Sequence, residues 1–226
     1  MGGLTRGRKR MHRATARTHA ALGLRAHSGW AVVVAVAGPP RSPAVVGRWR
    51  IELADPAVVG SKQPYHAAEG LDLKEAEEFL RRCTDGTRLL ARRALRAVIR
   101  DLRNRSHDVA GCGILLSSGR PATTLAATLA SHALIHTAEG ELFRDALIRA
   151  SKYCHLAVTA VRERELYARA AAELRVHADE LPGRLTELGR PIGPPWRQDE
   201  KHAALVAWLA LALATQQSLR PSRRNV

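Results

Sequence analysis

Two histidines and a glutamate stand close together in the middle of the chain, in the pattern His132-x3-His136-x2-Glu139. An α-helix turns by about 100° per residue, so on a helix these side chains fall within about 60° of one another. Imidazole and carboxylate groups at such spacings can share one metal ion or work as an acid–base pair. Apolar residues share the same stripe: Leu125, Leu129, Phe143 and Leu147. We therefore expect a buried or half-buried helix face on which each polar group needs a partner.

Two interpretations of this triplet remain open on the sequence alone. In the first, both imidazoles are core groups bonded to neighbouring carbonyls, and Glu139 pairs with an arginine. In the second, His132, His136 and Glu139 bind a divalent metal (Mg, Mn or Zn), and His136 and Glu139 take part in catalysis. Imidazole ligands favour Zn²⁺, Mn²⁺ or Fe over Mg²⁺.

The chain is strongly basic, with 36 Lys and Arg against 21 Asp and Glu in 226 residues and a net charge of +15. Such a charge is typical of proteins that bind nucleic acid. Nine of the positive charges lie in residues 1–18 and 220–226, which contain no acid. Arginine also outnumbers lysine 31 to 5, as the bias of a GC-rich bacterial genome would produce. A basic binding face and a compositional bias with solvated tails both remain open.

Cysteine content and hydropathy limit the class of protein. Three cysteines, odd in number and far apart, form neither a disulfide framework nor a C-x-x-C zinc motif, which indicates a reduced, cytoplasmic chain. We see no run of about 18 apolar residues, so we expect no membrane-spanning helix and no membrane partner. The length suits one ordinary domain with a real core.

Five segments have the patterns of β-strands. Residues 30–37 (WAVVVAVA) are β-branched and continuously apolar, which predicts a strand covered on both faces. Residues 45–53 alternate from Gly47 onward, which is typical of a half-exposed strand. With residues 21–25, these two form a predicted antiparallel meander, because the links between them are short. Residues 109–116 and 155–161 are two further short apolar strands.

Helical patterns separate the later strands, which indicates parallel neighbours joined by right-handed crossovers. We expect helices over residues 72–104, with an interruption at Gly86, and over 123–152, 163–176, 181–188 and 199–215. The expected fold class is therefore α/β: a mixed sheet of a three-strand antiparallel meander and two parallel strands, with helices on both faces. The expected organisation is a disordered basic arm (1–18), one domain (19–216) and a basic tail (217–226).

This order resembles the ribonuclease H-like fold, and within it the RuvC-like Holliday-junction resolvases. Residues 22–31 (LGLRAHSGWA) look like the first strand and turn of that family, and residues 199–208 (DEKHAALVAW) look like its acid-headed last helix. The resemblance covers about residues 20–214 and implies a protein that acts on nucleic acid.

The chain departs from the family at its catalytic carboxylates. The family's first-strand aspartate falls at Arg25 or Ala26, and its glutamate after the fourth strand falls at residues 116–118, which hold no acid. Only the acid of the last helix is present, as Asp199. Hydrolysis by two Mg²⁺ ions needs several carboxylates, so we do not expect the usual RuvC-type centre.

In the fold that the resemblance implies, the ends of the first and fourth strands meet the start of the last helix. We therefore expect Asp199 to complete a metal site with His132, His136 and Glu139 and to share their catalytic role. Contacts to nucleic acid or another anion are expected from His27, Ser28, Arg120 and Lys201. His66 lies in a loop after the third strand, where a histidine is more often simply exposed, and we leave it outside the site.

The sequence thus favours a RuvC-like protein that binds or acts on nucleic acid, with metal-dependent phosphodiester hydrolysis by a degenerate His/Glu/Asp site. Two alternatives remain: a catalytically inactive interaction module of the same fold, and a metal-dependent hydrolase of small molecules. The expected partners are nucleic acid and a second copy of the chain in a homodimer.

Overall fold

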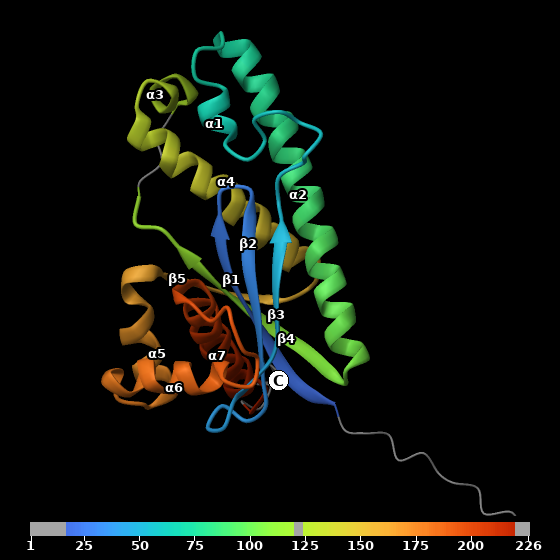
Figure 1. The fold of residues 1–226 in the computed structure, drawn as a ribbon, viewed down its shortest axis with the longest axis vertical. Helices are drawn as coiled ribbons and strands as arrows, with labels where there is room; N and C mark the ends of the chain where they lie inside the picture. The colour runs from blue at the N-terminus through green and yellow to red at the C-terminus, as the bar shows by residue number, and fades with distance from the viewer. Residues whose placement is uncertain (1–16, 120–123, 220–226) are drawn as a thin grey trace, which may run out of the picture.

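The computed structural model describes residues 17–119 and 124–219 and is built around one five-stranded sheet (Figure 1). The strand order is β3-β2-β1-β4-β5. The first three strands pair antiparallel, whereas β4 lies parallel to β1, and β5 lies parallel to β4. The strands are β1 (Thr18–His27), β2 (Trp30–Ala37), β3 (Ala44–Glu52), β4 (His107–Leu116) and β5 (Ala157–Arg162). The expected fold class, a ribonuclease H-like mixed sheet, is confirmed.

Helices cover both faces of this sheet (Figure 1). Side chains of β2 alternate between the two cores: Val33 packs in the core under the helices α2 and α4, and Val34 packs in the core under α7. This is why β2 has no polar residue. The first core is closed by α2 (Leu73–Asn104) and α4 (His132–Tyr153), and the second by α5 (Leu166–Leu174), α6 (Leu181–Gly189) and α7 (Gln198–Leu219).

Helix α7 lies directly against the backbone of the sheet. Residues 203–212 are almost completely buried, so this part of the helix is apolar all round. Gly23 of β1 and Gly113 of β4 are neighbours in register. A Cβ atom built on Gly23 would lie 1.7 Å from the carbonyl oxygen of Ala203, and one on Gly113 would lie 2.3 Å from that of Val206. Only glycine allows this approach, which brings the first turn of α7 beside the end of β1.

Several helix boundaries differ from those that the sequence predicted. Helix α2 continues through Gly86, because one glycine costs a helix only about 1 kcal/mol relative to alanine and packing compensates. The predicted helix over 123–152 is instead two helices, α3 (Leu125–Leu129) and α4, separated at Ala130 and Ser131. The predicted loop between β3 and α2 contains a short helix, α1 (Pro64–Ala67). Single 3-10 turns at Glu163–Glu165 and Ala178–Glu180 precede α5 and α6.

The predicted terminal arm and tail fall mostly outside the described residues. Strand β1 already begins at Thr18, and α7 continues to Leu219. Among the residues that the structure describes, no helix combines the length and the apolar character needed to cross a bilayer.

We predict that Gly23→Ala destabilises the protein by about 3 kcal/mol or more, because the added methyl group must displace backbone atoms of α7. The matched control is Gly86→Ala in α2, where a Cβ meets nothing within 4 Å. That change should stabilise the helix by about 0.5–1 kcal/mol. Urea unfolding of both variants measures the difference. Equal stability of the two variants would show that α7 does not depend on this contact.

Candidate metal centre

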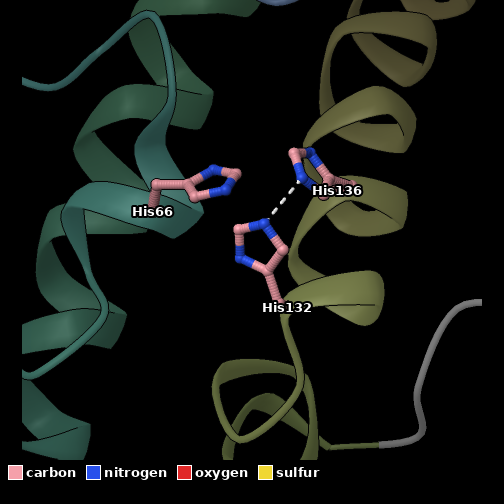
Figure 2. A group of neighbouring side chains, drawn as sticks. All are labelled: His66, His132 and His136. Carbon is pink, nitrogen blue, oxygen red and sulfur yellow. Dashed lines mark hydrogen bonds between the residues drawn. The ribbon is translucent and has the colours of Figure 1, made fainter.

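Three histidines from two helices converge at one end of the molecule (Figure 2). His66 belongs to α1, His132 is the first residue of α4, and His136 follows one turn later. Each offers a ring nitrogen, and the three nitrogens lie within 4.8 Å of one another. His66 is half-buried, whereas His132 and His136 are exposed.

The local folding of both helices explains this convergence. Pro64 is buried and fixes the start of α1, and Tyr65 packs against the neighbouring cores, so His66 is held in place. On the other side, the break before Ser131 makes His132 the first residue of α4. The first turns of α4 lie beyond the ends of the strands, near α1 and α3 (Figure 1). The polar stripe therefore meets α1 instead of the core, and the expected burial of His132 and His136 is wrong.

The geometry of the two α4 histidines suits a shared ion. Their Nε2 atoms are 3.1 Å apart. Two nitrogens bound at about 2.0–2.1 Å to one tetrahedral ion would be about 3.3–3.4 Å apart. At 3.1 Å the two lone pairs cannot face each other without a proton or a metal ion between them. The third ring, His66, lies edge-on to both, with centroids 5.1 Å from His132 and 4.7 Å from His136.

Glu139 lies behind His66 and fixes the orientation of its ring. The Glu139 Oε1 atom accepts hydrogen bonds from the His66 Nδ1 atom at 2.8 Å and from its backbone nitrogen at 3.2 Å. An ionised carboxylate only accepts, so in a pair of ionised Glu139 and neutral His66 the Nδ1 atom carries the proton and Nε2 has a free lone pair. Carboxylate–histidine pairs of this kind orient ligands in metal sites. Glu139 is therefore a positioning residue. The sequence predicted that Glu139 binds the ion directly, whereas in the structure it contacts His66, which would bind the ion.

The burial of Glu139 favours a positive charge nearby. The residue is 1% exposed, and no described residue donates a hydrogen bond to its Oε2 atom. Burial, and next the charge of Glu139, raise the pKa of Tyr65. A buried carboxylate is costly unless a cation compensates it. An ion on the far nitrogen of His66 would supply that compensation. None of the described arginines pairs with Glu139, the partner that the alternative interpretation assigned to it.

Asp199 does not join these histidines, so the expected four-residue site is wrong in this respect. Helices α4 and α7 cover opposite faces of the sheet (Figure 1), and Asp199 lies in the first turn of α7. Its carboxylate contacts the Arg25 Nε atom at 2.6 Å and the His27 Nε2 atom at 3.1 Å. The expected fold correctly predicted that Asp199 lies at the end of β1. It did not predict that Asp199 lies on the other face of the sheet from His132.

Arg25 is the centre of this second cluster. Besides Asp199, its guanidinium contacts Glu163 at 3.0 Å and the His202 Nδ1 atom at 2.9 Å. The Arg25 side chain is only 17% exposed. A guanidinium thus stands among the acids at the end of β1, where the resemblance would place a metal-binding carboxylate. These residues do not fit a two-metal carboxylate centre, because a cation occupies the position where a bridging carboxylate would be needed.

The other predicted contacts have ordinary surroundings. His27 stacks on Trp30 with ring centroids 4.2 Å apart. Ser28 is an exposed turn residue, and the Lys201 Nζ atom donates to the Thr186 hydroxyl at 3.2 Å. Arg120 lies outside the described residues. None of the three described residues contacts the histidine cluster.

The end of β4 also lacks an acid of its own. Ser117 accepts a hydrogen bond from Arg144, which also pairs with Glu141 at 3.0 Å. A hollow of about 360 Å³ lies beside these groups, between the ends of β4 and β5. Glu141 is thus held by an arginine, away from His132.

Sequence reasoning missed His66, the third member of the centre. The one local clue was Pro64 two residues before it, since proline favours the first turn of a helix. No spacing along the chain links His66 to a helix that begins 66 residues later.

Sheet order and strand direction define the class: this chain has a ribonuclease H-like fold. No protein-family model matches the sequence, and no curated protein is significantly similar to it. Among solved structures, two of RuvC from Thermus thermophilus are similar in fold, one of them in complex with a Holliday junction substrate. Their TM-scores are 0.48 and 0.49 at 10% identity, and each alignment covers 88% of this chain and 96% of the other.

The cluster around Arg25 predicts a dependence of stability on pH. Burial, and next the charge of Arg25, lower the pKa of His202, and burial also lowers that of His27. The unfolded chain takes up these protons near pH 6.5 while the folded chain resists them. The free energy of unfolding should therefore be highest above about pH 6.5 and fall as the pH drops below it.

His202→Gln should flatten this decline, leaving the part due to His27. Thermal unfolding of the natural and variant proteins between pH 7.5 and 5 measures it. Parallel pH profiles for the two proteins would show that His202 keeps its ordinary affinity for protons.

Proposed function

We propose that this protein is a metal-dependent hydrolase of nucleic acid, with one divalent ion bound by His66, His132 and His136. The observation that carries this proposal is the convergence of three imidazole nitrogens within 4.8 Å, with a buried carboxylate behind one of them. Catalytic zinc sites characteristically have three protein ligands and one open position. The exposure of His132 and His136 leaves such a position accessible to solvent and substrate.

Each residue of the centre has a distinct role in this proposal. His132 and His136 hold the ion from one helix, and His66 holds it from α1. Glu139 keeps the Nε2 atom of His66 free and directed toward the ion. A divalent ion with three imidazole ligands supplies Lewis-acid activation of water for hydrolysis. Asp199 takes no part, because it is bound to Arg25.

The choice of nucleic acid as the substrate class depends on charge. The net charge of +15 at pH 7 favours the binding of polyanions. A phosphodiester also presents oxygens that a divalent ion can polarise. The ribonuclease H-like fold agrees with this choice but does not carry it, since one fold supports many functions.

One observation favours a second candidate function, a structural ion. His66 lies on a four-residue helix within the long connection from β3 to α2, and an ion would fasten this connection to α4. An ion in that role would raise stability without hydrolysis. The two functions differ in whether loss of the ion abolishes hydrolysis or only lowers the melting temperature.

We predict that the untagged natural protein binds about one divalent ion per chain and that His132→Ala binds almost none. Elemental analysis after dialysis measures the content. The matched control is His177→Ala, an exposed histidine elsewhere, which should keep the ion. With Zn²⁺ or Mn²⁺, the natural protein should cleave labelled single strands, duplexes or junctions, and His132→Ala should not. A metal-loaded protein that cleaves none of them but melts higher than the metal-free form would favour the structural ion.

We also predict that Glu139→Gln weakens metal affinity about 10–100-fold, as loss of a partner of a ligating histidine does in other sites. The amide cannot accept the His66 proton as strongly, and the ring loses its fixed orientation. Competition with a chromogenic chelator measures the affinity. The control is Glu141→Gln, two residues away and bound to Arg144, which should leave affinity unchanged. Equal affinities for both variants would remove Glu139 from the centre.

A further inference from the structure

A basic groove lies at the opposite end of α2 and α4 from the histidines. It has a volume of about 890 Å³ and is formed by the last turns of α2, the end of α4 and the turn into β5. Its arginines are Arg93, Arg96, Arg100 and Arg103, all exposed. Their spacing of three, four and three residues places them on one stripe of the helix.

These four arginines have no acidic partners among the described residues. None of them has a carboxylate oxygen within 4.0 Å, and no acid lines the groove. The flanking arginines of the same helix differ: Arg88 pairs with Asp145, and Arg105 pairs with Asp101. The charge of the groove is therefore not neutralised from within, and four like charges on one stripe repel one another. An anionic ligand would relieve that repulsion.

We propose that this groove binds the sugar–phosphate backbone of a nucleic acid. From Arg93 to Arg103 the helix rises by about 15 Å. Phosphates along one strand of a duplex repeat about every 3.4 Å of its axis, so this stripe matches about four of them. Guanidinium groups also match phosphate oxygens in shape, with two parallel hydrogen bonds. A single phosphate cannot span about 15 Å and would leave part of the stripe unpaired, whereas an extended polyanion can contact all four arginines.

Tyr153 adds a surface suited to nucleotides. It lines the groove, is 53% exposed, and carries the guanidinium of Arg92 at 4.5 Å from its ring centroid. An exposed aromatic ring beside a basic stripe can stack a base of an unpaired strand. Cys154 next to it is no competing nucleophile: burial raises the pKa of its thiol, against the opposing charges of Arg96 and Arg92.

In this proposal the groove is the surface that binds the substrate of the proposed hydrolase. The inference that its ligand is nucleic acid rests on that proposed function. Along α4, the groove at Tyr153 is about 31 Å from His132. A duplex in contact with both sites would therefore span about nine base pairs. Binding in the groove needs no metal ion, so it is measured without one.

The test uses the full chain in the presence of a chelator, with fluorescence anisotropy of labelled duplex and single-stranded DNA at several salt concentrations. Arg96→Gln with Arg100→Gln should weaken binding of all sequences and lower the slope of log affinity against log salt by about 2 for duplex. The matched control is Arg184→Gln in α6 with Arg190→Gln just after it, two arginines that pair with Glu180 and Glu187. Both double variants lower the net charge from +15 to +13.

Three results would overturn the proposal: no binding by the natural chain, an unchanged slope in the groove variant, or an equal loss in both variants. Arg96→Lys with Arg100→Lys should retain most of the slope, and melting temperatures establish that each variant is folded. Metal content is measured separately. If the natural chain binds metal and cleaves DNA but the groove variant binds DNA as the natural chain does, the groove proposal alone is refuted. If the natural chain neither binds metal nor cleaves nucleic acid, the proposed function is refuted.

Discussion

The contact between α7 and two paired glycines is the constraint on which the rest of the fold depends. Gly23 and Gly113 lie side by side on β1 and β4, and carbonyl groups of α7 lie where side chains would otherwise be. This approach buries the apolar middle of α7, residues 203–212, and closes the second core. It also fixes the first turn of α7 beside the end of β1, which brings Asp199 and His202 to Arg25. The other helix layer is then free to carry the histidine centre.

Most of the fold could be predicted because its patterns are strong and local. The unbroken apolar run of β2 reflects burial on both faces, and the alternation of helices and later strands reflects parallel pairing. The break at Ser131 could not be predicted in the same way. Residues on both sides of it favour helix, and the two helices that it separates contact α2 and, from α4, also α1, which lie far away in the sequence. Gly86 is the opposite case. Glycine disfavours helix, but here it lies inside a continuous helix of 32 residues that its neighbours stabilise.

The candidate site was predictable only where its residues share a helix. The spacing of His132 and His136 follows from helical geometry, and the structure brings their nitrogens together. His66 comes from a separate helix of four residues, and its position depends on tertiary contacts. The error over Asp199 has a related cause: strand order predicts which end of the sheet a residue occupies, but two helices at one end can lie on opposite faces. The role of Glu139 as a partner of His66, and not of the ion itself, could be found only with both residues in view.

Arg25 gives the end of β1 a cation that is covalently part of the chain. Its guanidinium pairs with both Asp199 and Glu163 at every concentration of free metal, because it cannot dissociate from the chain. A metal ion at this end of the sheet would therefore have to compete with a cation that is already in place. Within residues 17–119 and 124–219, the group that would respond to metal scarcity is the proposed centre on α1 and α4. The groups that hold the sheet and the last helix together therefore lie apart from the three histidines, so loss of an ion from that centre would leave the Arg25 cluster intact.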